Sequence, residues 1–333
     1  SMAPLLLAVG WLLVPDALWA WGPGTHVALG ELILGSLYLL PPALQHLLSR
    51  FPIHFLYGNV AADISFAKKY VPEGRHCHHW HVGEELHQEA RHESEPLQAV
   101  ALGYLAHLAA DTVAHNLYIP RRLLLTSTTA AVGHTYWEHR MDVHVGEEYL
   151  GKARRLVFEN DHSDADALFD KVLSGTLFSF QTNRKIFRGM IQVQGHDRWI
   201  GVFDKLLKRS RFDVPDDLVD RYLSLSYDSI VDYLRSRHHS SPALLDPIGD
   251  LNLKLAKKVR RMAMAGGAAA DPAVLDEMAD EFFPFPTDPL TFWPEMQRLG
   301  LDLDPWEEPP PDELGHAPQL PTPFGRDPGA ALG

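Results

Sequence analysis

Histidines and acidic residues that could bind metal ions recur at four-residue steps between residues 107 and 138. His107, Asp111 and His115 are four residues apart, so on a helix their side chains emerge along one face. His134 and Glu138 repeat the step on a second predicted helix. Imidazole nitrogens and carboxylate oxygens are common zinc ligands. The stretch therefore predicts a metal site built from two helices.

The distance spanned by His107, Asp111 and His115 implies more than one metal ion. His107 and His115 would lie roughly 12 Å apart along a helix axis, too far to share one ion. Asp111 lies midway, and its two oxygens could bridge two ions. The alternative is an ordinary hydrogen-bonded His–Asp pair or a solvated face. Apolar neighbours such as Leu105 and Leu108 argue against it, because unligated ionisable groups are costly to bury among them.

Composition narrows the class of protein. The chain has 333 residues, 46% of them hydrophobic, which is enough for a substantial core in one large or two modest domains. The formal charge of −13 argues against a basic surface and against duplex nucleic acid as the main partner. Fourteen of the 19 histidines precede residue 145, so the candidate chemistry lies in the first half.

The N-terminal residues 3–14 form an apolar run that is too short to span a bilayer. The run predicts a secretory signal peptide over residues 1–20, with Pro15 as a breaker and cleavage after Ala20. The exported chain would then begin at Trp21, and Cys77, its single cysteine, could form no intramolecular disulfide. The alternative is a buried N-terminal helix of a cytosolic protein, in which Trp21 would carry an amide instead of a free amine.

Further candidate ligands precede the central stretch. Thr25 is a plausible cap for a helix that carries His26 in its first turn. Asp63 ends an apolar segment and is uninformative alone. Residues 76–81, HCHHWH, form the densest histidine cluster, of which at most two can face one ion because adjacent residues point in different directions.

The second half predicts an all-α protein. Amphipathic helical patterns follow Tyr149, without strand-like alternation of comparable length. We expect one multi-helix domain over residues 21–265 and a C-terminal arm over residues 266–333, whose last thirty or so residues are rich in proline and extended or disordered. Aromatic residues between 282 and 293 could dock the arm on the core. No glycine-rich phosphate loop or serine-nucleophile motif is present.

Several residues near these candidate ligands can be interpreted in more than one way. Pro120 is predicted to end the first helix, and the following Arg121 and Arg122 could lie at the rim of the site and attract an anionic substrate, or be simply solvated. Asp142 continues the face of Glu138 and could orient a ligand by hydrogen bonding. Four apolar residues could meet acyl chains, although core packing is the favoured reading. These are Phe51, Phe55, Leu56 and Tyr57.

Taken in order, nine of these residues resemble the ligand set of the zinc-dependent phospholipase C family. That family is related to single-strand-specific nucleases and to the N-terminal domain of glycosylphosphatidylinositol-specific phospholipase D. The resemblance covers residues 21 to about 150 and implies an all-α fold with three zinc ions. The nine residues are Trp21, His26, Asp63, His78, His107, Asp111, His115, His134 and Glu138.

The resemblance also implies how the ligands are shared. One ion would be bound by Asp63, His78, His107 and Asp111. A second would be bound by His115, His134 and Glu138. A third would be bound by His26, Asp111 and the backbone amine and carbonyl of Trp21. His78 is preferred to His76, the reserve candidate, because its separation from Asp63 resembles the nuclease branch.

The function implied by the resemblance is hydrolysis of phosphodiester bonds in phospholipids, either at a membrane surface or as free lipid. A hydroxide held by the ions would attack phosphorus, with Asp63 and Asp111 as catalytic residues; Asp63 could alternatively orient or deprotonate the water. The HxxxDxxxH and HxxxE spacings resemble lipid-cleaving members, whereas the gap between Trp21 and His26 resembles nucleases. The alternatives are a single-strand nuclease and a non-catalytic zinc-binding surface protein. The head group, the bond cleaved and any protein partner stay open.

Overall fold

The protein is described by a computed structural model, which covers residues 21–64, 77–125, 130–173, 184–185, 188–189, 213–267 and 271–298. The described residues contain helices and no strand, so the all-α prediction is confirmed. The main helices are α2 (Pro23–Gly35), α3 (Pro42–Arg50), α4 (Pro52–Ala61), α5 (Trp80–Glu93), α6 (Glu95–Val113), α7 (Ile119–Leu125), α8 (Ala130–Val145), α9 (Glu147–Glu159), α10 (Ser163–Val172), α13 (Asp216–Ser236), α14 (Asp250–Ala265), α15 (Pro272–Phe282) and α16 (Phe292–Arg298). The predicted signal peptide lies outside the described residues.

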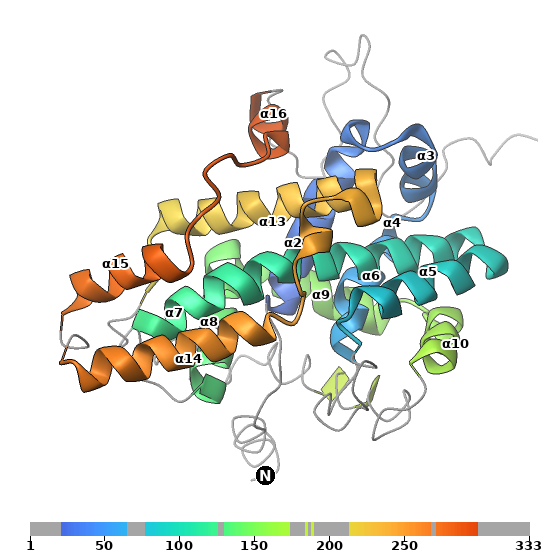
Figure 1. Cartoon of the computed structure of the whole chain (residues 1–333). Helices are drawn as coiled ribbons and strands as arrows, with labels where there is room; N and C mark the ends of the chain where they lie inside the picture. The colour runs from blue at the N-terminus through green and yellow to red at the C-terminus, as the bar shows by residue number, and fades with distance from the viewer. Residues whose placement is uncertain are drawn as a thin grey trace, which may run out of the picture.

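Helix α6 is the central element of the fold. Ser94 caps its N-terminus by accepting a hydrogen bond from Leu97 N, and from Ala99 to Thr112 its residues are buried. A short π-helical turn, η4 (Ala114–Tyr118), joins α6 to α7. Figure 1 shows this continuous rod between α13 and α14. The rod, Glu95–Leu125, is long and apolar enough to cross a membrane, but 94% of its most apolar window is buried inside the protein, as expected of a core helix.

The prediction that Pro120 ends this helix is wrong. Pro120 is the second residue of α7 and is buried. Proline has no N–H to donate to the carbonyl four residues earlier. In η4 each backbone hydrogen bond spans five residues instead of four, as in the bond from Ile119 N to Ala114 O. A proline directly after such a turn interrupts no regular α-helical ladder, and the rod continues.

Helices α4 and α6 pack backbone to backbone at two glycines. A Cβ atom added to Gly58 would lie 2.0 Å from Val100 O, and one added to Gly103 would lie 2.0 Å from Phe55 O. No larger residue fits at either position without moving a helix. This close approach brings Asp63, in the 3₁₀ turn η2 (Ala62–Ile64) after α4, beside the middle of α6.

The C-terminal arm docks on the core through α15 and α16. Phe283 is buried, and the backbone N–H of Trp293 donates to Asp228 of α13 at 2.7 Å. Ring contacts strengthen the docking, because Trp293 meets Tyr227 edge to face at a centroid distance of 5.4 Å. The docking predicted for these aromatic residues is therefore observed, although Phe282 stays 36% exposed. The predicted extended end lies beyond residue 298, outside the described residues, and the domain boundaries stay a prediction.

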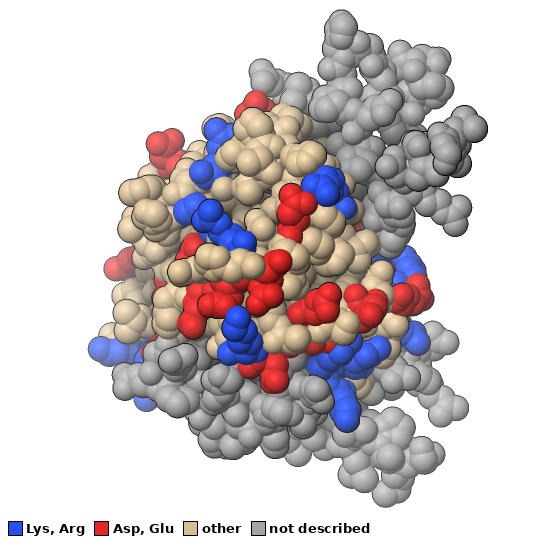
Figure 2. Space-filling view, turned by 90° about the vertical axis from the view of Figure 1, so that its right-hand side faces the viewer, with Lys and Arg blue, Asp and Glu red and all other residues tan. Residues whose placement is uncertain are grey.

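Charges of both signs lie intermixed on the face shown in Figure 2. Helix α5 contributes through pairs with neighbouring elements, Glu89 with Lys171 at 2.7 Å and Glu84 with Arg237 at 2.9 Å. Intermixed charges give no extended positive field on this face.

Candidate metal centre

Five side chains from four segments of the chain converge beside the middle of α6. Two come from α6 itself and the others from α2, from η2 and from the residues just before α5. Each is at most 3% exposed. They are His26, Asp63, His78, His107 and Asp111.

Asp111 lies at the centre of this group. Its Oδ2 is 3.1 Å from His107 Nε2 and 3.3 Å from His78 Nε2. Its Oδ1 is 3.3 Å from His26 Nε2. The two oxygens thus face two different sets of imidazoles, as a bridging carboxylate requires.

Asp63 lies beside two of the same histidines. Its Oδ1 is 3.4 Å from His78 Nε2 and 3.8 Å from His107 Nε2. These residues form two overlapping groups of three. Within each group the three ligand atoms lie within 4.8 Å of one another, which is close enough to hold a metal ion. They are His26, Asp63 and His107, and His78, His107 and Asp111.

Backbone and thiol contacts orient the rings. The 2.7 Å contact of His107 Nδ1 with the carbonyl of Asn59 makes Nδ1 the donor, so Nε2 keeps its lone pair for a ligand. His78 Nδ1 is 3.2 Å from Cys77 Sγ, and Tyr104 Oη donates to the Cys77 carbonyl at 2.5 Å. Sequence reasoning missed Asn59 and Tyr104. Tyr104 precedes His107 by one helical turn, a weak signal, whereas a carbonyl such as that of Asn59 leaves none.

Electrostatics keep the ligands in their metal-binding forms. Burial alone would raise the pKa of Asp111, but the neighbouring His107, with His26 and His78, holds that pKa well below its usual value. Burial, and then the proximity of His107, lowers the pKa of His26. Metal binding needs an ionised carboxylate and a neutral imidazole, and the two shifts favour these forms of Asp111 and His26.

Two of these residues have buried polar atoms without a hydrogen-bond partner. Both carboxylate oxygens of Asp111 and both ring nitrogens of His26 are buried without a hydrogen bond. Buried polar atoms normally have one, and a cluster of oxygen and nitrogen ligands is the donor set that zinc prefers. The residues therefore fit bound zinc.

The predicted second set of ligands is described only in part. His115 lies in the π turn, and the 2.6 Å contact of its Nδ1 with Pro247 O makes Nε2 the ligand-forming nitrogen. Glu138 is buried in α8. His134 also lies in α8, but its side chain falls outside the described residues. The loop carrying Pro247 gave no sequence signal.

The residues around the N-terminus of α2 position His26. Trp21 is buried, donates from Nε1 to Ala110 O at 3.1 Å and stacks on Tyr118. Asp142 accepts hydrogen bonds from Thr25 N at 2.8 Å, Thr25 Oγ1 at 2.6 Å and Gly24 N at 3.2 Å. These amides are first-turn donors that have no partner within the helix. Burial raises the pKa of Asp142 to about 6. Asp142 thus caps the helix that carries His26.

The structure corrects the predicted substrate rim. Arg121 and Arg122 are buried, so they are neither at an exposed rim nor solvated. Arg121 donates to Ala279 O at 3.0 Å and to Phe283 O at 2.8 Å, carbonyls at the C-terminus of α15. Arg122 lies over the ring of Trp137.

Two other predictions have clear outcomes. Of the apolar residues considered for acyl chains, Phe55, Leu56 and Tyr57 are fully buried and Phe51 is half-buried, so the core reading holds. The reserve ligand His76 lies outside the described residues.

Comparison with known proteins supports the resemblance of this region. Residues 25–182 match the family model described as zinc dependent phospholipase C. The predicted resemblance is confirmed over these residues. Neither a curated protein nor a solved structure matches the chain.

Proposed function

We propose that the protein is a zinc-dependent phosphoric diester hydrolase that acts on phospholipids. The observation that carries this proposal is Asp111, a buried carboxylate whose two oxygens face histidines from different elements. The family match supports a phospholipid as the substrate class. The nine residues that we propose as ligands are those implied by the resemblance, with His76 in reserve.

Zinc bound at such a site polarises phosphoryl oxygens and lowers the pKa of water to about 7. The chain supplies the rest. Asp63, His78, His107 and Asp111 would hold the group, and the Asn59 carbonyl keeps the lone pair of His107 on Nε2. We assign Asp63, beside His78 and His107, as the carboxylate that orients the attacking water and accepts its proton.

The third ligand set depends on processing of the chain. We propose that cleavage after Ala20 exports the protein and frees the amine of Trp21. The indole bond to Ala110 O would hold that new terminus one residue before Asp111 along α6. Export to the cell exterior or periplasm agrees with the location of the family's members, which are typically secreted.

The test combines metal content with turnover of two substrates. The secreted protein should contain about three zinc ions and hydrolyse a phosphatidylcholine analogue faster than single-stranded DNA. Asp111→Asn keeps the shape but removes the bridging charge, and should lower both zinc content and turnover, the latter by at least about a hundredfold. Preferred cleavage of DNA would indicate a nuclease, and full zinc without turnover would indicate a non-catalytic zinc protein.

A further inference from the structure

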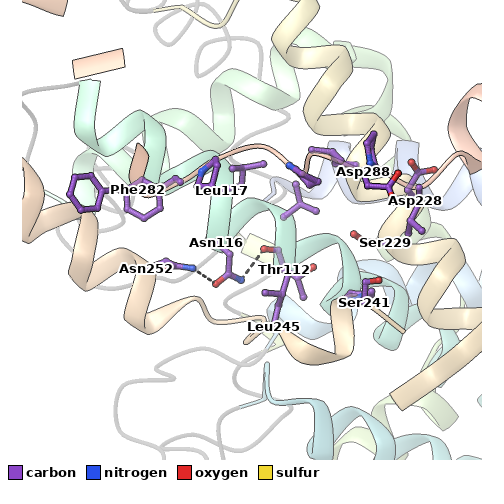
Figure 3. Close-up of a pocket in the computed structure, with 18 residues that line it drawn as sticks. Thr112, Asn116, Leu117, Asp228, Ser229, Ser241, Leu245, Asn252, Phe282 and Asp288 are labelled. Carbon is purple, nitrogen blue, oxygen red and sulfur yellow. Dashed lines mark hydrogen bonds between the residues drawn. The ribbon is translucent and has the colours of Figure 1, made fainter. Parts of the chain in front are cut away.

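A cleft of about 350 Å³ lies against the central rod between Thr112 and Leu117, which follow Asp111 along the chain. Its floor is formed by Thr112 and Asn116, and its walls by Leu225 and Ser229 of α13 and by Asn252 of α14. The arm from Phe282 to Leu290 crosses over it, as Figure 3 shows. The volume is at the lower end of the range of small-molecule sites. Most of the lining is apolar, with polar groups at intervals.

Exposed apolar side chains gather around this cleft. Leu245 and Phe282 line it and are 43% and 36% exposed. Leu244, next to Leu245, is 86% exposed, and Leu251, next to Asn252, is 80% exposed. These four are among only seven large apolar side chains that are exposed in the part of the chain that the structure describes. An apolar cleft with an apolar rim favours a ligand with a hydrocarbon chain.

Positive charge lies along α14 and not at the rim, because Asp228 and Asp288 line the cleft and Asp250 pairs with Lys254 at the start of the helix. This helix begins beside the rim and exposes Lys254, Lys257, Lys258 and Arg261 in a chain whose net charge is −13. Exposed Met262 and Met264 lie near its other end. A basic helix with exposed apolar residues is typical of proteins that lie on an anionic lipid surface. The acidic residues of neighbouring α15 confine this attraction to α14.

The cleft shares a wall with the predicted second metal site. Asn116 Nδ2 donates to Asp246 O at 2.8 Å, and Asn252 donates to Asn116 Oδ1 at 2.8 Å. One residue after Asp246, the carbonyl of Pro247 contacts His115 Nδ1 at 2.6 Å. A lipid in the cleft would therefore lie directly behind the loop that orients His115.

We propose that this cleft binds one acyl chain of a phospholipid taken from a bilayer surface, while the exposed leucines enter that surface and the cations of α14 meet its phosphate groups. The choice of a phospholipid rests on the proposed function. At roughly 30 Å³ per small group, about the share of one water molecule in the liquid, the cleft holds on the order of ten carbon atoms.

The first test measures binding without turnover. Monomeric lysophosphatidic acids of increasing chain length, whose phosphate is a monoester and offers the proposed diesterase no bond to cleave, are titrated calorimetrically into the zinc-loaded full chain. Each added CH₂ should strengthen binding about fourfold until the cleft is full, after which affinity should level off. Affinity that does not change with chain length would overturn the proposal.

A matched pair of variants locates the binding. Ser229→Trp places a large ring in the cleft, and excluding three CH₂ groups weakens binding roughly fiftyfold. Ser224→Trp makes the same change at a partly exposed position of α13 outside the cleft lining, and should leave affinity unchanged. Equal affinities of the two variants, both folded by circular dichroism, would overturn the proposal.

The surface is tested with sedimented vesicles. Leu244→Ser combined with Leu251→Ser should weaken binding to phosphatidylglycerol vesicles at least tenfold, whereas Val143→Ser, at a 41% exposed position of α8, should not. Undiminished binding of the double variant would contradict the role of the rim. None of these variants should alter turnover of a water-soluble phosphodiester that has no acyl chain. Absence of that turnover in every protein, with vesicle binding intact, would refute the proposed hydrolase and leave the lipid site standing.

Discussion

Replacing Gly58 by alanine tests whether the contact of α4 with α6 sets the geometry of the metal centre. The new Cβ would lie 2.0 Å from Val100 O and 2.9 Å from both Gly103 Cα and Tyr104 N, all main-chain atoms of α6. Ordinary contact begins near 3.4 Å, so the helices must separate by more than 1 Å. No flexible side chain is available to yield.

The expected loss of stability follows from two opposing terms. Overpacking in a well-packed core costs up to about 3 kcal/mol. Alanine in place of a helical glycine returns about 0.5–1 kcal/mol. In urea titration, the free energy of unfolding of the zinc-free Gly58→Ala protein should therefore be about 2 kcal/mol lower than that of the unsubstituted zinc-free protein.

The metal centre should respond as well. Asp63 follows the end of α4 by two residues, so a shift of α4 moves its carboxylate relative to His107 and Asp111. Metal–ligand distances tolerate only about 0.2 Å. Zinc affinity, measured by competition with a chromophoric chelator, should fall about tenfold or more.

Gly151→Ala is the matched control. Its Cβ would meet nothing closer than Arg155 Nη1 at 3.9 Å, so the variant should gain stability and bind zinc normally. If Gly58→Ala behaved like Gly151→Ala in both assays, the contact of α4 with α6 would not determine the site.

Three further predictions follow from individual contacts. Burial raises the pKa of Asp228 from 3.8 to about 7, so its stabilising effect is complete below pH 3.8 and is lost as the pH rises through 7. Asp228→Asn keeps an acceptor for Trp293 N–H and should flatten this dependence, worth at most about 3 kcal/mol between pH 5 and pH 8, in urea unfolding at those two pH values. Arg121→Met should cost about 2 kcal/mol by leaving the Phe283 carbonyl without the Arg121 donor, while Ala279 O still accepts from Phe283 N–H. It should not change turnover of a soluble substrate, and selective loss of turnover would restore the arginine to the substrate rim. Removing zinc with a chelator should lower the thermal midpoint, because each site at a hundred times its Kd contributes about 2.7 kcal/mol, and an unchanged midpoint would mean that zinc does not bind the folded protein.

The common helix face of His107 and Asp111 could be predicted from the sequence because helical periodicity is local. His107 and Asp111 are on one face of α6, as their four-residue step requires. The approach of Asp63 and His26 to that face could not be derived from spacing, and came from the family resemblance alone. It depends on the packing of other helices on α6, where Gly58 and Gly103 allow the close approach of α4. A glycine within a helix signals close approach only when its partner is known.

The two arginines were misplaced for a different reason. Their charge and the preceding Pro120 predicted a surface connection, since long cations are seldom buried. Burial is stable here because the carbonyls of α15 and the ring of Trp137 receive the guanidinium groups. Those partners lie far away in the sequence or on another helix, where no local pattern reveals them.

The π turn explains how the rod that carries His107, Asp111 and His115 continues through Pro120. In a regular α-helix the Asn116 carbonyl would accept from residue 120, but Pro120 has no N–H. In the π turn a backbone hydrogen bond spans one residue more than in an α-helix, as in the bond from Ile119 N to Ala114 O. This wider turn contains His115, whose ring is then fixed by the Pro247 carbonyl instead of by its own helix. The eight-residue step from His107 to His115 therefore spans two kinds of helix, and Gly249, at φ +63°, lets the supporting loop lie directly against the His115 backbone. A side chain at Gly249 would displace His115 while leaving His107 and Asp111 in place, which makes the predicted second zinc site separable from the first.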